Sequence, residues 1–201
     1  MRTAVVTAAA VIGGLLPSVA MVGTASAVAS EPLPTRTART IELSTVETGV
    51  LPVTGARQVF TLSNSSAGGS VYVTITAGSN GNLQWNLRAP SGELVYDRQF
   101  SGDPGLVPLT ASGSYTLTLE AQRGTGSYGF EVFGVPAPQS FPISLGTTVS
   151  DGDPGPGAGR LEAPGSLDVY TFSADGGQEI YVRLNNSYLP GQTWSLQGPD
   201  G

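Results

Sequence analysis

The fold is decided by a stretch in which apolar and polar residues alternate, Gly113-Ser114-Tyr115-Thr116-Leu117-Thr118-Leu119-Glu120. Its large apolar side chains fall on every second residue. A β-strand points successive side chains to opposite faces, so the stretch predicts a strand with one buried and one solvated face. After a turn at Gly124-Thr125-Gly126, the alternation returns in Tyr128, Phe130 and Val132. The two stretches together predict antiparallel β structure packed on a core.

Four more stretches alternate in the same way, and Gly- and Pro-rich turns separate them. They are Arg57–Ser63, Val71–Thr76, Leu83–Arg88 and the short Leu94–Tyr96. In the turn Ala89-Pro90-Ser91-Gly92, proline presets φ at the first corner and glycine supplies the positive φ that closes a hairpin. No amphipathic helix is indicated beyond Arg39. We therefore predict an all-β fold, an antiparallel sandwich or jelly roll, over residues 40–135.

The chain then begins to repeat itself. Val59-Phe60-Thr61-Leu62 recurs as Val169-Tyr170-Thr171-Phe172 at an offset of 110 residues, and Trp85-Asn86-Leu87 recurs as Trp194-Ser195-Leu196 at an offset of 109. Ile41 and Leu43 match Ile143 and Leu145 at an offset of 102, which places about eight extra residues in the loop around 151–159. Such self-similarity indicates tandem modules. We predict a linker at 136–140 and a second sandwich module at 141–201.

The second copy lacks counterparts of residues 93–133, which carry about three strands of the first. Half a sandwich leaves an open edge and an uncovered apolar face. We expect that the second module is truncated. Completion of its sheet by strands of a partner chain is the alternative.

The first residues predict export. Arg2 is the only charge before Glu31, the stretch 4–23 is apolar or small, and Ala25-x-Ala27-x-Ala29 fits the small-residue rule for signal cleavage. We predict a signal peptide at 1–29, a flexible leader at 30–39 and a secreted, extracellular product. A membrane anchor is the alternative, because the apolar stretch approaches spanning length.

The composition excludes most catalytic chemistry. The chain has no His and no Cys, and all nine of its Lys and Arg residues are Arg. This removes Ser-His-Asp triads, Schiff bases, thiol nucleophiles and the usual zinc ligands. The net charge of −6 disfavours binding to nucleic acid. A pair of carboxylates is the remaining standard catalyst, and Glu120 and Glu131 are expected on neighbouring strands, each on the solvated face. We predict that the chain is not an enzyme.

Several of these motifs resemble the bacterial pre-peptidase C-terminal domain family. The resemblance rests on 168–172 (Asp-Val-Tyr-Thr-Phe), Gly176-Gly177 and the run from Gly113-Ser114-Tyr115 to Gly126-Ser127-Tyr128, and it covers roughly 40–135 and 141–201. Gln58 stands where the second copy has Asp168, so the first copy departs from the pattern. The stretch 157–165 also looks like repeats in large secreted actinobacterial proteins. The family resemblance implies a β-sandwich accessory domain of exported enzymes or surface arrays. Some relatives bind calcium or insoluble polymers.

Four aromatic residues are candidate ligand contacts. Trp85 and Trp194 occupy equivalent positions and can stack on sugar rings or polymer backbones, but both lie in phase with the apolar face, which favours a place in the core. Tyr72 and Tyr181 lie in the opposite phase, on the outer face. Cross-strand packing is the alternative for these two.

Acidic residues provide a candidate Ca²⁺ site at Asp151, Asp153 and Asp168. Calcium prefers several oxygen ligands, and alternating carboxylates on a Gly-rich loop can supply them. Asp97 and Asp103 flank a loop in the first copy and are weaker candidates for Ca²⁺ ligands. Solvated turns are the alternative at all these positions. No other cofactor is expected.

The leading functional hypothesis is an exported, non-catalytic accessory or interaction module of pre-peptidase C-terminal type. A carbohydrate- or polymer-binding module that uses aromatic residues on one sheet is the first alternative. A structural spacer in a cell-surface array is the second. The expected partner is an extracellular polymer or protein. We expect no binding to nucleic acid and, after signal cleavage, no association with a membrane.

Overall fold

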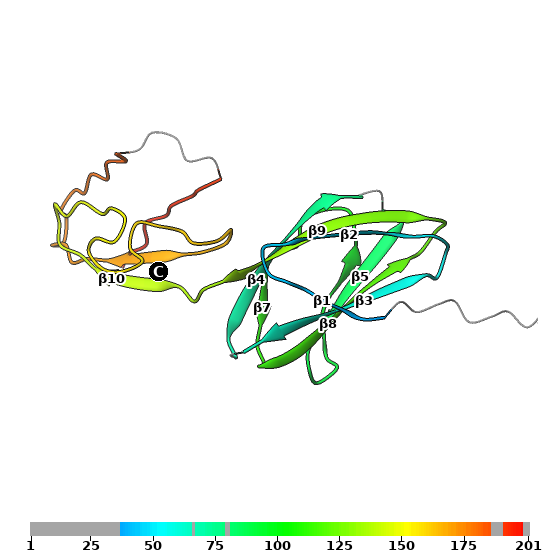
Figure 1. The fold of residues 1–201 in the computed structure, drawn as a ribbon. Coiled ribbons are helices and arrows are strands. Elements are labelled where there is room, and N and C mark those ends of the chain that lie inside the picture. Colours follow the sequence, from blue (N-terminus) through cyan, green and yellow to red (C-terminus); the bar gives the residue numbers. More distant parts are fainter. Residues whose placement is uncertain (1–36, 66, 79–80, 186–190, 199–201) are drawn as a thin grey trace, which may run out of the picture. The chain divides into compact units, whose positions relative to one another are not determined.

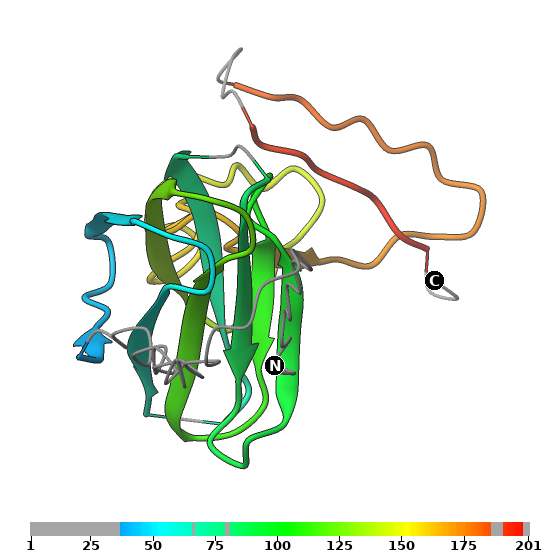
Figure 2. The ribbon, with the colours of Figure 1, turned by 90° about the vertical axis from the view of Figure 1, so that its right-hand side faces the viewer.

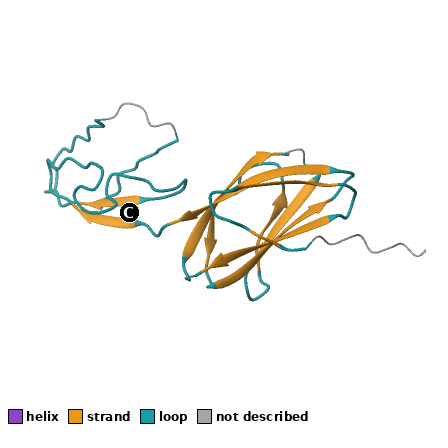
Figure 3. Ribbon diagram, viewed as in Figure 1, coloured by secondary structure: helices purple, strands orange, loops and turns teal. Residues whose placement is uncertain are grey.

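The computed structural model describes residues 37–201 except 66, 79–80, 186–190 and 199–201. In this part of the chain the regular elements are all strands, drawn in orange in Figure 3. No helix in it is long and apolar enough to cross a membrane. The expected signal segment 1–29 lies outside the described residues. The strands are β1 (Arg39–Thr40), β2 (Val46–Leu51), β3 (Arg57–Asn64), β4 (Gly69–Ala77), β5 (Leu83–Arg88), β6 (Leu94–Gln99), β7 (Gly105–Leu109), β8 (Gly113–Ala121), β9 (Gly126–Val135), β10 (Gln139–Pro142) and β11 (Asp168–Thr171).

Strands β1 to β9 form two sheets, which Figure 1 shows as two layers. One sheet has the strand order β1-β3-β8-β5-β6, and the other has the order β2-β9-β4-β7. Every ladder in them is antiparallel except the short parallel pair of β1 and β3. The structure thus confirms the predicted all-β, antiparallel sandwich.

The alternating stretches supply the core between the sheets. On β8 the buried residues are Tyr115, Leu117, Leu119 and Ala121, and on β9 they include Tyr128 and Phe130, as the period of two predicts. Aromatic rings meet edge to face at the centre. The Phe130 ring lies 5.2 Å from Phe60 and 6.2 Å from Trp85, and Phe100 lies 5.0 Å from Trp85. Such T-shaped pairs add about 0.5–1.5 kcal/mol each beyond the burial of their area.

One expectation about these strands is wrong. Glu120 and Glu131 lie on strands that follow one another in sequence, but β8 and β9 belong to different sheets and are not hydrogen-bonded neighbours. The turn at 122–125 carries the chain from one sheet to the other. Because each acid is on the outer face of its own sheet, the two carboxylates lie on opposite sides of the sandwich. Glu120 instead pairs with Arg57, at 2.9 Å.

Two strands lack a clear alternating pattern. In β2, the inward-facing positions include Glu47 and Gly49. Glu47 is only 6% exposed, and its Oε2 lies 2.6 Å from Nη2 of Arg39. Gly49 has no room for a side chain because a Cβ there would clash with the Tyr128 hydroxyl. In β7, Pro108 disfavours a strand, and it is accommodated because β7 is at the edge of its sheet.

Beyond Val135, strands β10 and β11 form a parallel pair. Phe141 of β10 stacks on Tyr170 of β11, with ring centroids 5.5 Å apart. After β11, the described residues contain no further strand, and the chain continues as the extended stretch shown in orange to red in Figure 2. Many apolar side chains of this stretch are exposed.

Candidate functional site

A groove lies where the edge strands of the two sheets, β6 and β7, are joined by the loop 100–104. It is shallow and open to solvent, with a volume of about 390 Å³. Its lining is mostly polar and consists of Tyr96, Arg98, Gln99, Ser101, Gly102 and Asp103. Because the groove brings a cation, an aromatic ring and the polar groups of a loop together, it is the candidate site of the first sandwich.

The β5–β6 hairpin positions the strand that forms one wall of the groove. Its turn is the one predicted from Pro90-Ser91-Gly92: Gly92 has φ of +86°, and its N–H donates to the Ala89 carbonyl over 2.8 Å. The register then places Tyr96 opposite Leu87 and Arg98 opposite Trp85. Since Leu87 and Trp85 point into the core, Tyr96 and Arg98 lie in the inward phase at the rim of the sandwich.

Tyr96 lines the groove next to Arg98. Its ring meets Trp85 edge to face at 5.6 Å, and the guanidinium of Arg98 lies over its ring, 5.6 Å from the centroid. Partial burial raises the pKa of the Tyr96 phenol above its ordinary value of 10.0, and the positive charge of Arg98 opposes this shift. The phenol is therefore neutral at physiological pH. What Tyr96 offers to the groove is the ring face over which the Arg98 guanidinium lies.

The opposite wall is a loop held at both ends. Phe100 is fully buried, and its N–H donates to the Leu83 carbonyl over 2.8 Å. Asp103 accepts hydrogen bonds from the Ile75 N–H at 2.6 Å and the Thr74 hydroxyl at 2.9 Å. These bonds continue the edge of β4 where its pairing with β7 ends, at Val73. The two anchors leave Ser101 and Gly102 between them at the rim of the groove.

Behind Tyr96 lies a second, much smaller cavity of about 20 Å³ between the sheets. Its lining is apolar and includes Trp85, Val107 and Leu117. A space of this size holds at most one water molecule, and it offers that water no polar partner. The cavity is therefore a packing defect of the core.

The candidate aromatic residues lie in different environments. Trp85 is in the core and only 1% exposed, in the place that the packing alternative predicts for it. Tyr72 is half-buried on the outer face of β4, between Phe133 and Leu106 in the register. Tyr181 is 88% exposed and Trp194 is 63% exposed. The roles of these residues as ligand contacts remain predictions.

The structure does not gather the candidate calcium ligands. No cluster of three or more acidic side chains that could hold a metal ion occurs among the described residues. Asp151 and Asp153 flank the tight turn at Gly152, which is closed by two backbone hydrogen bonds of 3.0 Å between Ser150 and Asp153. Asp168 instead accepts a hydrogen bond from the Tyr170 hydroxyl at 2.8 Å, and that hydroxyl accepts one from the Gly159 N–H at 2.7 Å.

The acids of the first copy also have other partners. Asp97 accepts a hydrogen bond from the Gln84 amide across the β5–β6 ladder, over 2.5 Å, and Asp103 binds β4 as described above. Neither carboxylate is aimed at a shared ion position with a third acid in the described part of the chain. The calcium hypothesis thus remains a prediction that this geometry does not support.

Sequence reasoning did not identify the groove. One feature of the sequence could have revealed it. Tyr96 and Arg98 are two residues apart, so an arginine lies on the same inward face of the strand as the tyrosine. An inward-pointing charge is expected only at the edge of a sheet, where it can reach solvent. The strand was predicted to end at Tyr96, two residues before Arg98. Arg98 was therefore not placed on this strand.

No family model matches the chain, and no curated protein is similar to it. Solved structures with a similar fold include a periplasmic inhibitor of g-type lysozyme, PliG of Aeromonas hydrophila, with 17% identity, a TM-score of 0.41 and coverage of 49% of this chain and 96% of the other. The pre-peptidase C-terminal domain of Bacillus anthracis collagenase has 24% identity, a TM-score of 0.39 and coverage of 50% and 98%. A mutant of the Escherichia coli PliG inhibitor has 18% identity, a TM-score of 0.38 and coverage of 48% and 96%.

Proposed function

We propose that the chain is an exported, non-catalytic interaction module, and that the groove between β6 and the loop 100–104 binds a carboxylate group of an extracellular polymer. The observation that carries this proposal is Arg98. Its guanidinium is stacked on Tyr96 in the groove, and among the described residues no carboxylate lies within ion-pair distance of it. Arg39 and Arg57, by contrast, are each paired with a glutamate.

The chemistry of the groove favours a carboxylate over other groups. A guanidinium presents two parallel N–H donors that match the two oxygens of a carboxylate. Stacking on Tyr96 restricts the orientation of this fork before the ligand arrives. Asp103, which lines the same groove, and the net charge of −6 oppose every anion, and they oppose a doubly charged phosphate monoester more strongly than a singly charged carboxylate.

The absence of catalysis is supported by the residue types. The chain has no His, Lys or Cys, and its candidate pair of acids, Glu120 and Glu131, is divided between two sheets. Export is supported by the signal-like sequence of residues 1–29. The pre-peptidase C-terminal type is supported by the sequence motifs around 113–128 and 168–177.

The proposal is tested by retention of the mature chain, residues 30–201, on insoluble polysaccharides. We expect binding to uronic-acid polymers such as polygalacturonate and alginate, and none to neutral cellulose or chitin. Arg98→Ala should weaken this binding at least tenfold, while Arg98→Lys should recover only part of it, since a lysine lacks the bidentate fork.

The matched control is Arg123→Ala, which removes the same charge from an exposed turn before β9. It should leave retention unchanged, and all variants should keep the β-sheet circular dichroism spectrum. Equal losses in the Arg98 and Arg123 variants would reduce the effect to net charge and overturn the groove as the site. Equal retention on neutral polymers would overturn the carboxylate class.

A further inference from the structure

The tetrapeptide Gly-Asp-Pro-Gly occurs twice in the chain, at 102–105 and at 152–155. The first occurrence lies in the loop between β6 and β7. The second lies in the loop that joins β10 to β11 in the second region of the molecule, which begins at Gln139. Asp103 and Asp153 are both exposed to solvent. The two sites therefore share their sequence and their access to water, and they differ in what holds the aspartate.

The carboxylate of Asp103 is occupied by hydrogen bonds. Its Oδ1 accepts one from the Ile75 N–H at 2.6 Å, and its Oδ2 accepts one from the Thr74 hydroxyl at 2.9 Å. Hydrogen bonds to a charged group are among the stronger ones in proteins, so both oxygens are restrained on β4. Both bonds must break before this carboxylate can turn towards its own main-chain carbonyl.

The carboxylate of Asp153 is not held in this way. Among the described residues, its side chain has neither a hydrogen-bond partner nor an ion pair. In the same loop, Asp151 and Arg160 are exposed and take part in no ion pair of the described chain. On β11, Asp168 and the Tyr170 hydroxyl bond to each other at 2.8 Å. The side chain of Asp153 is therefore free to approach its own backbone.

The main-chain carbonyl of Asp153 has a hydrogen-bond donor aimed at it. Ser150 N–H donates to this carbonyl over 3.0 Å, and Asp153 N–H returns a bond of 3.0 Å to the Ser150 carbonyl. A donor on a carbonyl oxygen stabilises the negative charge that develops there when a nucleophile attacks the carbon. In the described part of the chain, the main-chain carbonyl of Asp103 has no such donor.

The backbone on both sides of the Asp153–Pro154 bond is anchored in the loop. Gly152 N–H donates to the Ala158 carbonyl over 2.8 Å, and Ala158 N–H donates to the Gly155 carbonyl over 3.0 Å. Ala158 itself is fully buried. Reacting groups that are held in place lose less entropy on reaching the transition state, so this anchoring favours a reaction within the loop.

We propose that the Asp153–Pro154 peptide bond is a built-in cleavage site, at which the carboxyl group of Asp153 is the nucleophile. A carboxyl oxygen attacks the main-chain carbonyl carbon of the same residue and closes a cyclic anhydride. The bond from this carbon to the Pro154 nitrogen breaks, and the nitrogen takes the carboxyl proton. Water then opens the anhydride, which leaves Asp153 with its side-chain carboxyl group and a new terminal one.

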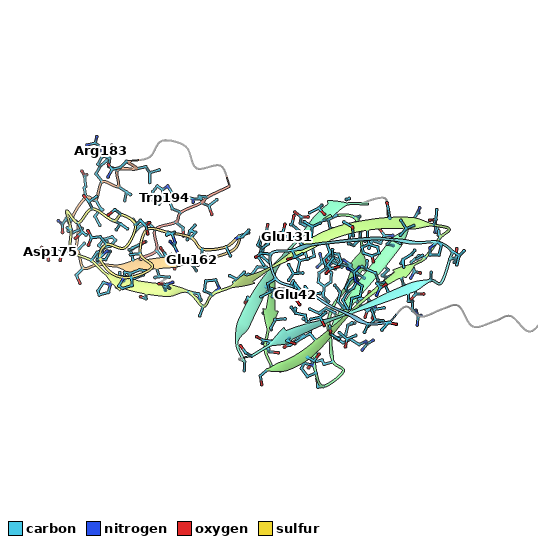
Figure 4. All side chains as sticks on the ribbon, viewed as in Figure 1. Glu42, Glu131, Glu162, Asp175, Arg183 and Trp194 are labelled. Atoms are coloured by element: carbon cyan, nitrogen blue, oxygen red, sulfur yellow. The ribbon has the colours of Figure 1, made fainter. Side chains whose placement is uncertain are left out.

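Cleavage divides the chain between β10 and β11. The two pieces are then joined only by contacts of this strand pair and its loop. They include the stacking of Phe141 on Tyr170 and a 3.2 Å hydrogen bond from the Gln139 amide to Glu162, which is labelled in Figure 4. A two-stranded pair is only marginally stable by itself. Cleavage should therefore release the first sandwich from the second region.

The experiment follows the mature chain, residues 30–201, by intact-mass spectrometry at pH 4 and at pH 7, with circular dichroism to show that it stays folded. We expect one fragment that ends at Asp153 and one that begins at Pro154. They should form faster at pH 4, because the step uses the carboxyl proton. Cleavage at Asp103–Pro104 should be about tenfold slower, since its carboxylate must first leave two donors. Equal rates at both bonds, or no cut at Asp153, would overturn the proposal.

Unfolding provides an internal control. In concentrated urea at pH 4, the two identical tetrapeptides should be cleaved at equal rates, because the contacts that distinguish them are gone. A preference for Asp153 that persists in urea would assign the effect to the neighbouring sequence and would overturn a site built by the fold.

Three variants test the roles of the side chains. Asp153→Glu keeps the charge but lengthens the side chain, so it should abolish the cut at this site. Asp103→Glu is the matched control and should leave that cut unchanged. Thr74→Val removes one donor from Asp103 and should raise cleavage at Asp103–Pro104 several-fold; no increase would contradict protection by these bonds. Arg98→Ala should alter neither cut, so the test is independent of the groove.

Discussion

The first sandwich and residues 139–198 share a sequence pattern but differ in burial. Trp85 and Trp194 stand at matching places in the two copies, yet one is 1% exposed and the other 63%. The opening strand pair and its flanking turns are alike in both regions. The difference lies in the strands that cover the apolar face, β8 and β9, which only the first region has among the described residues. The alternating pattern thus predicts which face of a strand a residue lies on. Whether that residue is buried depends on strands that lie far away in the sequence.

The largest expected effect comes from the two tryptophans. Trp85→Ala should cost about 3–5 kcal/mol of unfolding free energy, because it leaves a large cavity among Phe100, Phe130 and Tyr96. Trp194→Ala should change stability by less than about 0.5 kcal/mol, as exposed substitutions usually do. Urea unfolding followed by circular dichroism measures both. A loss in the Trp194 variant as large as that in the Trp85 variant would show that the second region is closed in solution.

Much of the fold followed from the sequence because strand alternation is a local signal. The stretches at β3, β4, β5, β8 and β9 were recognised, and the residues predicted to share one face on β8 and β9, from Tyr115 to Phe130, are buried. Strands β2 and β7 were missed because their patterns are altered by a buried ion pair at Glu47 and an edge proline at Pro108. The division of β8 and β9 between two sheets is a property of the turn that joins them, and alternation carries no information about it.

The candidate site was less predictable than the fold. The groove depends on the conformation of the loop 100–104, which is held by Phe100 in the core and by the bonds of Asp103 to β4. These contacts join residues that are 17 to 29 positions apart in the sequence. The sequence offered Asp103 as a calcium ligand because it shows the residue type, whereas its backbone and hydroxyl partners become visible only in the fold.

An intermediate effect on stability is expected at Arg39 of β1 and Phe141 of β10, which occupy matching positions in the two regions. Arg39 pairs with the buried Glu47 and lies over the Phe60 ring, 5.6 Å from its centroid. Arg39→Ala should cost about 1–2 kcal/mol, because it leaves the Glu47 carboxylate without an ionic partner in a largely apolar setting. Phe141→Ala removes a stacked ring from Tyr170 and should cost under about 1 kcal/mol.

The double variant Arg39→Ala with Glu47→Gln separates the ion pair from the packing of the arginine over Phe60. If the pair matters, Glu47→Gln should recover part of the stability lost in Arg39→Ala, since it removes the uncompensated charge. No recovery would assign the cost to the lost contact with the aromatic ring. The same urea titration measures all four proteins.

The smallest expected effect is the ionisation of two tyrosines, one in each region. Burial raises the pKa of Tyr96 in the first sandwich and, as the largest contribution, that of Tyr170 in the second, both above the ordinary value of 10.0. The unfolded chain therefore loses these protons at lower pH than the folded chain does. Stability is unaffected by either group below pH 10 and falls as the pH rises through 10 towards the folded pKa.

Ultraviolet titration of the phenolates measures these two groups directly. Tyr96→Phe should remove one phenol that ionises above pH 10 from the titration curve. Tyr170→Phe should remove another, the one whose hydroxyl binds the Gly159 N–H. Each substitution should leave the ionisation of the other tyrosine unchanged, because Arg98 and Trp85 act on Tyr96 whereas Gly159 and Asp168 act on Tyr170. A change in both ionisations after either substitution would contradict these separate local causes.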